Sequence, residues 1–236
     1  MNEVTPARSF FITGSDTAVG KTLVATAILL AARKKGLRTL GIKPVSAGCE
    51  IREGRLVNQD ALELQAAATV ALDYETINPV ALEPFLAPHI AAAQIGVDLS
   101  AAQLIEHFEG LRGLDAELVI VEGAGGWLVP LNAHETLADV CCGLGMPVIM
   151  VVSMRLGCLN HALLTAAAIR SSGLALSGWV ANCAEPEMVV LEENVQSLKA
   201  RLDAPLVARI PFMGENCKPE DIVEFIDLDA VLTAGR

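Results

Sequence analysis

The chain has 236 residues, of which 53% are hydrophobic and 4% aromatic. This composition predicts one domain, spanning residues 1–236, with a core made mainly of Ala, Val, Leu and Ile. The formal net charge of −11 opposes extended binding to nucleic acid or to an anionic membrane, so we expect neither as a partner.

The cysteines, the histidines and the N-terminus indicate an untargeted cytoplasmic protein without a structural metal site. The six cysteines include no C-x-x-C pair, and the four histidines lack metal-ligand spacing. Residues 1–8 are polar, which predicts a flexible segment rather than a secretory signal. The longest apolar stretch, 138–152, is too short and too interrupted for a membrane span. We therefore expect reduced thiols in the cytoplasm.

Short apolar runs alternate with longer helical patterns along the chain. This alternation predicts a doubly wound α/β fold, a mainly parallel sheet with helices on both faces. The expected strands are 9–13, 39–44, 118–122, 148–153, 177–182 and 206–210. The expected helices are 21–35, 58–68, 101–113, 137–143, 160–172, 187–202 and 219–225. We expect irregular structure at 45–56, which is polar, and at 74–89, where three prolines oppose a regular helix.

The first expected strand leads directly into a candidate phosphate-binding loop. Residues 13–22 read TGSDTAVGKT and precede a helix-forming run, which is the strand–loop–helix context of a P-loop. In such a loop, backbone N–H groups bind phosphate, Lys21 neutralises it and the Thr22 hydroxyl binds Mg²⁺. Five residues separate Gly14 from Gly20, one more than in the usual G-x-x-x-x-G-K-[ST] pattern. We predict phosphate binding rather than a structural turn with a surface lysine.

Polar side chains follow other expected strands, where ligands bind in this fold class. Glu122 ends an apolar strand, as the metal-binding acid of P-loop enzymes does, and glycines follow it. Lys43 ends another strand and is a candidate to stabilise a transferring phosphoryl group, with an ordinary surface lysine as the alternative. Asp60, taken alone, is better interpreted as an acid in a first helical turn.

Two further polar residues have roles that the residues alone leave open. Asn182 ends a strand and either caps the turn or contacts a nucleotide base. Asp16 places a negative charge inside the P-loop, beside the expected phosphates. That charge makes sense if Asp16 faces a cationic substrate or the metal.

Together these segments resemble the dethiobiotin synthetases, ATP-dependent ligases that act near the end of biotin synthesis. The P-loop with five intervening residues is the family's own form. The matching segments occur in the family's order and span almost the whole chain, at 13–22, 41–45, 58–62, 121–127, 156–165, 178–182 and 210–211. The resemblance implies a P-loop NTPase-type version of the predicted α/β fold.

The resemblance also implies a reaction, with 7,8-diaminononanoate, CO₂ and ATP as substrates and Mg²⁺ as cofactor. One amine takes up CO₂ as a carbamate, ATP phosphorylates the carbamate, and the second amine closes a cyclic urea with release of phosphate. Lys43 and Lys21 would be the catalytic residues, because carbamate and triphosphate are both anionic. The metal ligands would be Thr22, Asp60 and Glu122, since Mg²⁺ prefers hard oxygen ligands.

The same resemblance implies the remaining contacts. The ATP-binding residues would be Ala18, Val19, Gly20, Lys21, Thr22, Leu23, Asp60, Glu122, Gly123, Ala124, Gly125, Asn182, Pro211, Phe212 and Met213. The substrate-binding residues would be Asp16, Thr17, Lys43, Ser46, Gly157, Cys158 and Asn160. In the family, the 156–160 segment comes from the other subunit of a homodimer, so the active site would lie at the subunit interface.

Two positions depart from the family's pattern. The family usually reads Lys-Pro-Val-x-[ST]-Gly, whereas here Ser46 precedes Ala47 and the hydroxyl is shifted by one place. Either Ser46 compensates, or one substrate hydrogen bond is absent. Cys183 follows Asn182 where an Asp is often found, which leaves nucleotide selectivity beyond ATP open.

Three other classes of protein fit the sequence less well. Partitioning ATPases carry an extra lysine early in the P-loop, where this chain has Ser15 and Asp16. Amidotransferase-type synthetases carry an added glutaminase domain, for which this chain has no room. A non-enzymatic binding module does not account for two lysines, a threonine and a glutamate placed at one phosphate site.

Overall fold

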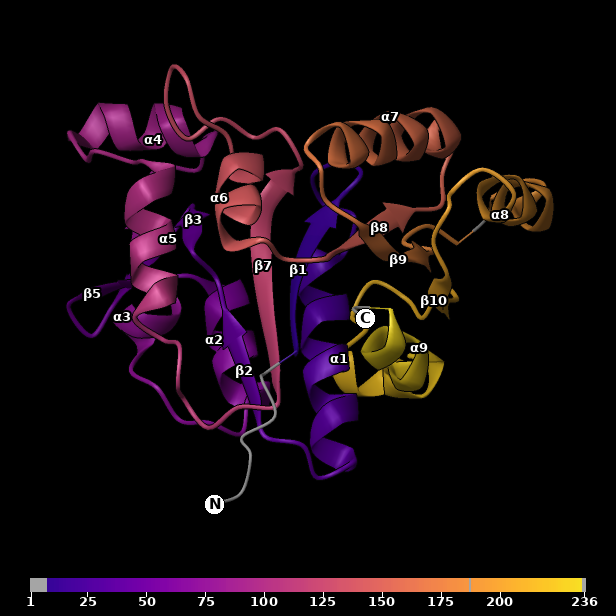
Figure 1. Ribbon diagram of the computed structural model, residues 1–236, viewed down its shortest axis with the longest axis horizontal. Coiled ribbons are helices and arrows are strands. Elements are labelled where there is room, and N and C mark those ends of the chain that lie inside the picture. Colours follow the sequence, from indigo (N-terminus) through magenta and orange to yellow (C-terminus); the bar gives the residue numbers. More distant parts are fainter. Residues whose placement is uncertain (1–7, 187, 235–236) are drawn as a thin grey trace.

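The computed structural model describes residues 8–186 and 188–234, and a six-stranded parallel sheet forms its centre (Figure 1). The strands are β1 (Arg8–Gly14), β2 (Thr39–Ile42), β7 (Leu118–Gly126), β8 (Val148–Ser153), β9 (Leu176–Asn182) and β10 (Leu206–Ile210). Their order is β10-β9-β8-β1-β7-β2. The chain passes from β1 to the edge strand β2, returns to β7 beside β1, and then crosses to β8, β9 and β10 on the other side, which confirms the predicted doubly wound fold.

Helices cover both faces of the sheet. They are α1 (Lys21–Lys34), α2 (Gln59–Ala67), α5 (Ala101–Glu109), α6 (Leu137–Leu144), α7 (Cys158–Ser171), α8 (Leu191–Lys199), the 3₁₀ helix η1 (Pro219–Phe225) and α9 (Leu228–Thr233). On one face, Ile12 and Ile149 pack with α1, η1 and α9; on the other, Phe11 and Met150 pack with α6, α7 and α8. Because successive strand residues point to opposite faces, both sets are buried.

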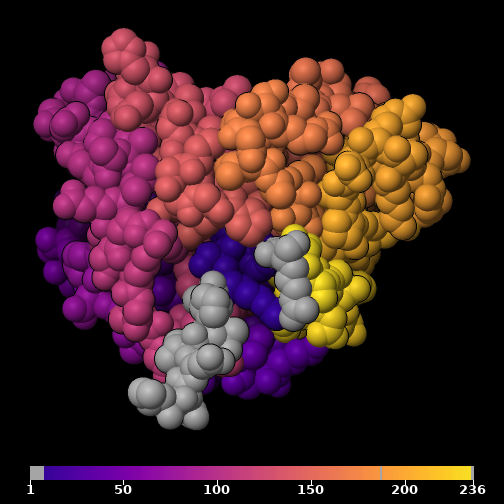
Figure 2. Space-filling model, viewed as in Figure 1, coloured from indigo at the N-terminus to yellow at the C-terminus, as the bar shows by residue number. Residues whose placement is uncertain are grey.

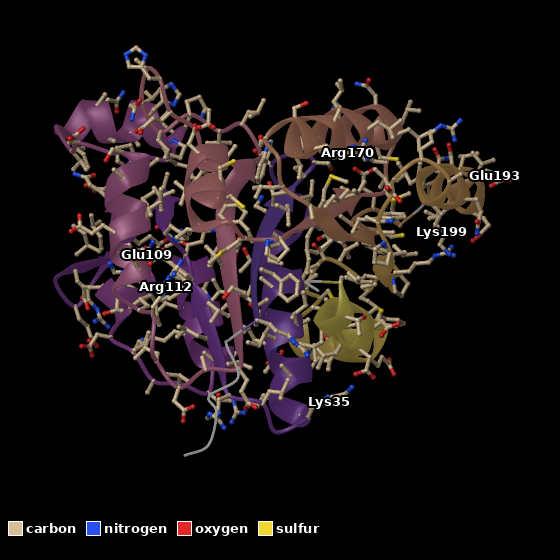
Figure 3. The ribbon with its side chains drawn as sticks, viewed as in Figure 1. Lys35, Glu109, Arg112, Arg170, Glu193 and Lys199 are labelled. Atoms are coloured by element: carbon tan, nitrogen blue, oxygen red, sulfur yellow. The ribbon has the colours of Figure 1, made fainter. Side chains whose placement is uncertain are left out.

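The C-terminal segment covers the face of the sheet beside α1. Figure 2 shows this segment, in yellow, against the indigo residues of α1. Lys35 Nζ, just after α1, lies 2.6 Å from Asp229 Oδ1 of α9. Lys35, Glu193 and Lys199 lie on the outside of the molecule (Figure 3), where ion pairs contribute little to stability. No helix in 8–186 or 188–234 has both the length and the apolar character needed to cross a membrane.

The first strand begins earlier and the third expected strand ends later than predicted. The Arg8 N–H donates to Glu117 O at 3.0 Å, so Arg8 belongs to the sheet and not to the flexible segment predicted at 1–8. The rest of that segment, 1–7, lies outside the described residues. β7 continues past Glu122 to Gly126, which pairs with Gly14 of β1. Gly14 and Gly126 therefore lie side by side where β1 leads into the P-loop.

The expectation of irregular structure at 45–56 and 74–89 is wrong in part. The first segment contains β3 (Val45–Ala47), β4 (Glu50–Arg52) and most of β5 (Arg55–Val57), and the second contains α3 (Tyr74–Ile77), β6 (Val80–Leu82) and the start of α4 (Pro88–Ile95). β3 pairs with β6 in parallel and so joins the two segments. Pro88 is tolerated because it occupies the first turn of α4, where its missing N–H needs no partner.

Several other element ends differ from the prediction. β2 ends at Ile42, since the Lys43 N–H donates to Ile77 O at 2.9 Å instead of continuing the sheet. α8 is shorter than the predicted 187–202 because Val190 adopts a left-handed conformation with φ 55° before it; residue 187 lies outside the described residues. η1 is a 3₁₀ helix, and α9, capped by Asp227, has no counterpart in the prediction.

Candidate active site

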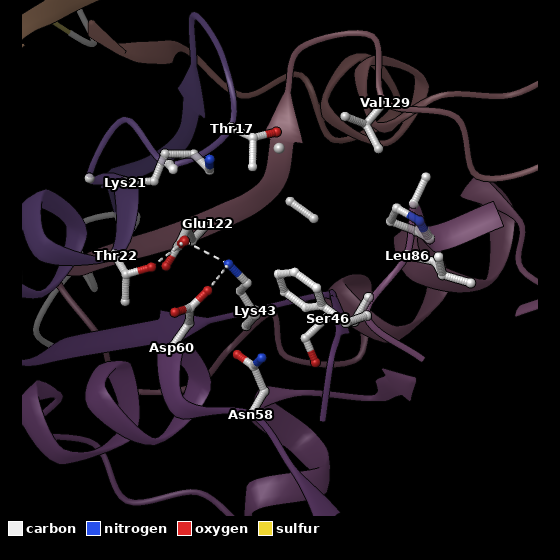
Figure 4. Close-up of a pocket in the computed structure, with 18 residues that line it drawn as sticks. Thr17, Lys21, Thr22, Lys43, Ser46, Asn58, Asp60, Leu86, Glu122 and Val129 are labelled. Carbon is white, nitrogen blue, oxygen red and sulfur yellow. Dashed lines mark hydrogen bonds and ion pairs between the residues drawn. The ribbon is translucent and has the colours of Figure 1, made fainter. Parts of the chain in front are cut away.

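A pocket of about 690 Å³ opens at the carboxyl ends of β1, β2 and β7 (Figure 4). Its walls come from the P-loop, the end of β2, β3, the start of α2, the end of β7 and the segment before α4. Predicted site residues that line it are Thr17, Ala18, Gly20, Lys21, Thr22, Lys43, Ser46, Asp60, Glu122, Ala124 and Gly125. The fold therefore brings together residues that are more than 100 positions apart in the chain.

The P-loop reaches α1 through a tight left-handed turn. Gly20, immediately before α1, has φ 88°, and a Cβ atom there would overlap Nδ2 of Asn182. Asn182 Nδ2 donates to Val19 O at 2.9 Å, so the end of β9 holds the loop in place. The first N–H groups of α1 have no acceptor within the helix and are available to an anion.

Lys43 lies at the centre of an ion-pair cluster next to the P-loop. Its Nζ lies 2.6 Å from Glu122 Oε1 and 2.8 Å from Asp60 Oδ2. The Thr22 hydroxyl donates to the same Glu122 oxygen at 2.8 Å (Figure 4). Lys43 and Glu122 are 3% and 0% exposed, and buried charges persist only when paired. The cluster therefore holds these four side chains in a defined geometry.

Burial and pairing set the charge states of the cluster. Burial alone lowers the pKa of Lys43, but the carboxylates of Glu122 and Asp60 outweigh it and the pKa is raised. Burial raises the pKa of Glu122 against the opposing effect of Lys43, whereas Lys43 outweighs burial at Asp60 and lowers its pKa. Burial and the charge of Lys43 lower the pKa of Lys21 to about 8. Both lysines are therefore mainly protonated at neutral pH.

The oxygen atoms of the cluster fit the requirements of Mg²⁺. Glu122 Oε2 is buried and has no hydrogen-bond partner among the described residues. An unsatisfied buried carboxylate oxygen is costly unless a cation approaches it. Mg²⁺ is usually bound by one or two carboxylates together with substrate phosphates. Thr22, Asp60 and Glu122 provide that donor set beside a P-loop.

A second pocket of about 360 Å³ lies on the other side of the P-loop. Its walls include the predicted ATP-binding residues Ala18, Gly20, Leu23, Asn182, Pro211, Phe212 and Met213, of which the last four are expected at the base. Ala18 and Gly20 also line the larger pocket. The two pockets therefore suit the base and the phosphates of one nucleotide. Cys183, the residue that departs from the family's pattern, lines the smaller one.

Comparisons with known proteins decide the family. A family model described as an AAA domain matches residues 8–219. The chain is 56% identical over 205 residues to the ATP-dependent dethiobiotin synthetase BioD of Cellvibrio japonicus, covering 86% of this chain and 89% of that protein. It is 49% identical over 220 residues to the BioD of Pseudomonas paraeruginosa, covering 93% and 96%. The chain belongs to the dethiobiotin synthetase family.

Two solved structures of low sequence identity share the fold of this chain. They support the fold assignment and say nothing further about its function. The septum site-determining protein MinD of Pyrococcus horikoshii, solved with Mg-ADP, has a TM-score of 0.56 at 16% identity and matches 97% of this chain and 94% of its own. Chloroplast FtsY of Physcomitrella patens has a TM-score of 0.52 at 16% identity, covering 98% and 68%.

One group of predicted substrate contacts lies away from the large pocket. Gly157 and Cys158 begin α7, and Asn160 follows in its first turn; among the described residues, these three are not part of the pocket wall. The Cys158 side chain is 3% exposed and packs in the core, and its backbone N–H donates to Arg155 O at 3.0 Å. Leu156, just before α7, is 99% exposed.

Asp16 is engaged by a residue that the sequence analysis passed over. Arg155 Nη2 lies 2.8 Å from Asp16 Oδ2, and His161 Nδ1 lies 3.6 Å from the same oxygen. Arg155 follows β8, so the topology brings it to the P-loop. No local motif marks Arg155, and only the observation that ligands gather at strand ends could have found it.

The pocket wall also contains an apolar side that sequence reasoning missed. Ala47, Phe85, Leu86, Pro88 and Val129 form it. All but Val129 belong to the two segments, 45–56 and 74–89, that were expected to be irregular. Ser46 also lines the pocket, and its hydroxyl donates to Asn78 Oδ1 at 2.7 Å.

Proposed function

We propose that this chain is an Mg²⁺-dependent ligase that converts 7,8-diaminononanoate, CO₂ and ATP into dethiobiotin, ADP and phosphate. The observation that carries the proposal is the convergence of the Lys43–Glu122–Asp60 cluster with Lys21 and Thr22 in one pocket. Relatives that are 49% and 56% identical are ATP-dependent dethiobiotin synthetases, which supports the reaction and the use of ATP.

The reaction consists of three bond-forming steps. The nitrogen of an uncharged amine attacks CO₂, which gives a carbamate and a proton. A carbamate oxygen attacks the γ-phosphorus of ATP, ADP leaves, and a carbamic–phosphoric anhydride forms. The second amine then attacks the carbonyl carbon, the bond from carbon to the phosphate oxygen breaks, and the cyclic urea, phosphate and a proton result. None of these steps needs a covalent enzyme nucleophile, so catalysis rests on positioning and electrostatics.

Lys43 and Lys21 supply the positive charge for the phosphoryl transfer. The carbamate and the γ-phosphate are both anionic and repel each other as they approach. A buried ammonium acts there with little screening by water, and the raised pKa of Lys43 keeps it protonated. Thr22, Asp60 and Glu122 would hold Mg²⁺, which would supply further neutralisation of phosphate charge.

The remaining pocket residues bind the two ends of the substrates. The apolar side of the large pocket, with Ala47, Phe85 and Val129, suits the aliphatic part of diaminononanoate. The Ser46 hydroxyl already donates to Asn78, so it has only a lone pair left and accepts a substrate N–H rather than donating to the carbamate. Asn182 and the 211–213 segment enclose the adenine.

We also infer a cytoplasmic homodimer whose active sites lie at the subunit interface. Leu156, just before α7, is 99% exposed, and Leu164, on α7, is 62% exposed. These exposed apolar side chains favour an interface there. The N-terminal end of α7 suits the substrate carboxylate, and the 157–160 segment would reach the pocket of the other subunit. All six cysteines are free thiols, as expected in the cytoplasm.

The function is tested by omitting one reactant at a time. The purified protein is incubated with ATP, Mg²⁺, diaminononanoate and bicarbonate, while phosphate is measured by absorbance and dethiobiotin by mass spectrometry. Phosphate and dethiobiotin are expected in equal amounts, and only when every reactant is present. Phosphate release at the same rate without the diamine would contradict the proposal and indicate a P-loop ATPase of another kind.

A further inference from the structure

Two buried residues outside the predicted site, Tyr74 and Asn78, hold the backbone that carries Lys43. They are 3% and 2% exposed and lie at the start and just after the end of α3. Asn78 Nδ2 donates to Lys43 O at 2.7 Å. The Lys43 N–H donates to Ile77 O at 2.9 Å. Both polar groups of the Lys43 backbone are therefore bound to the α3 segment rather than to the main sheet.

The same two residues hold the helix that carries Asp60. The Tyr74 hydroxyl accepts a hydrogen bond from the Asn58 N–H at 2.6 Å. Asn58 is the N-cap residue of α2, and its side chain accepts from the Ala61 N–H at 3.4 Å. Asp60 occupies the first turn of α2, so Tyr74 fixes the point from which the Asp60 carboxylate extends.

The directions of the hydrogen bonds that Tyr74 and Asn78 make are determined. An amide N–H can only donate, so the proton of the Tyr74 hydroxyl is free to go to Asn78 Oδ1, 2.9 Å away. Asn78 Oδ1 also accepts from the Ser46 hydroxyl at 2.7 Å, which leaves Nδ2 to donate to Lys43 O. Burial raises the pKa of Tyr74, so the phenol keeps the proton that the network requires.

We propose that Tyr74 and Asn78 are positioning residues of the ligase, which set Lys43 and Asp60 at the separation that phosphoryl transfer requires. The network connects the end of β2, β3 and the start of α2, and these are three walls of the large pocket. Its two branches lead to the two partners of one ion pair, 2.8 Å apart. The proposal rests on the function proposed above for Lys43.

The test is the substitution Tyr74→Phe, which removes one hydroxyl and keeps the buried ring. Loss of the hydroxyl leaves the Asn58 N–H without its acceptor and Asn78 Oδ1 without one of its two donors. A small displacement of a catalytic group costs up to about 100-fold in rate, so we expect kcat to fall about 10- to 100-fold. Because Tyr74 lies outside both pockets, the Kd for ADP measured without Mg²⁺, which does not depend on the metal ligand Asp60, is expected to change less than about twofold.

Thr69→Val is the matched control, because it removes a hydrogen bond at the opposite end of β2. The Thr69 hydroxyl accepts from the Thr39 N–H at 2.7 Å, far from the pocket wall. Thr69→Val is expected to lower the melting temperature while leaving kcat within about twofold of the unsubstituted protein. A comparable fall in kcat for both variants would show a general loss of stability and would overturn the positioning role.

Asn78→Asp provides a second, independent variant with nearly the same shape. It keeps the acceptor for Tyr74 and Ser46 but replaces the amide that donates to Lys43 O. We expect a fall in kcat at an unchanged Kd for ADP, as for Tyr74→Phe. Full activity in either variant would overturn the proposal.

A double-mutant cycle links the effect to Lys43 and separates this inference from the function itself. Asn78→Asp is combined with Lys43→Ala, and residual single-turnover rates are compared. Asn78 donates to the Lys43 backbone, so if it acts through Lys43, Asn78→Asp causes no further loss in that background; an additional loss of the same size would overturn the role. If Lys43→Ala is inactive and Tyr74→Phe is fully active, the function stands and the positioning role fails. Absence of dethiobiotin with the unsubstituted protein would overturn both.

Discussion

Lys43 is the side chain whose removal is expected to separate nucleotide binding from chemistry. It lies between Glu122 and Asp60, whereas the proposed phosphate-binding groups belong to the P-loop and α1. Loss of one preorganised charge at a developing anion typically costs 100-fold or more in rate. The two roles should therefore respond differently to substitution.

For Lys43→Ala, we predict that kcat for dethiobiotin falls by about 100-fold or more, while the Kd for ADP changes less than about threefold. Steady-state kinetics and calorimetric titration measure the two quantities. Lys35→Ala is the control, because Lys35 is paired with Asp229 on the surface and lies outside both pockets. Near-normal turnover of Lys43→Ala would rule out its catalytic role.

For Thr22→Val, we predict a rise of about tenfold in the Mg²⁺ concentration that gives half-maximal activity, because one oxygen ligand is lost. Thr26→Val, one turn later on α1, is the matched control. Thr26 is buried, and its hydroxyl has no partner in the part of the chain that the structure describes. If Thr22→Val and Thr26→Val show the same metal dependence, Thr22 is not a ligand.

The P-loop is the element whose backbone geometry is most demanding. Gly20 combines a φ of 88° with close approach of Asn182, whereas Gly36, after α1, has φ 77° and open space around it. We predict that Gly20→Ala abolishes ATP binding and that Gly36→Ala keeps it, with a stability loss of about 1 kcal/mol from the left-handed backbone. Nucleotide titration of the two variants measures the difference. Equal affinities would show that the turn tolerates a side chain.

Elements with a strong apolar period could be predicted from the sequence, and short paired elements could not. β8 and β10 match the predicted bounds: all six residues of β8 are buried in the sheet, and so are Val207, Ala208 and Ile210 of β10. β3 and β6 have three residues each and exist because they pair with one another across 35 positions of sequence. Such pairing leaves no local signal, which explains why the α3 segment was missed.

The candidate site shows the same division. Residues in motifs, such as Lys21 and Glu122, could be placed because strand, loop and helix signals surround them. Arg155, Tyr74 and Asn78 could not, since their importance arises from contacts with distant segments. Motifs identify the groups that touch a ligand, and tertiary contacts identify the groups that hold them.

At the scale of the whole molecule, the proposed dimer makes each active site depend on two chains. A mixture of two inactive variants, Lys43→Ala and Leu156→Asp, should regain activity after the subunits exchange. A heterodimer has one site in which both contributions are unaltered, so about a quarter of normal activity is expected at equal amounts. Recovery is measured after mild dissociation and mixing. Leu156 lies before α7 and outside both pockets of its own chain. No recovery, with both variants folded, would contradict a shared site.

The most direct test of the proposed chemistry is the fate of oxygen from CO₂. The protein is supplied with C¹⁸O₂, ATP, Mg²⁺ and diaminononanoate and quenched before the label exchanges with water. Because a carbamate oxygen attacks phosphorus and then leaves with it, one labelled oxygen should appear in phosphate and the other in the ring carbonyl of dethiobiotin. Unlabelled phosphate beside labelled dethiobiotin would contradict the phosphorylated carbamate.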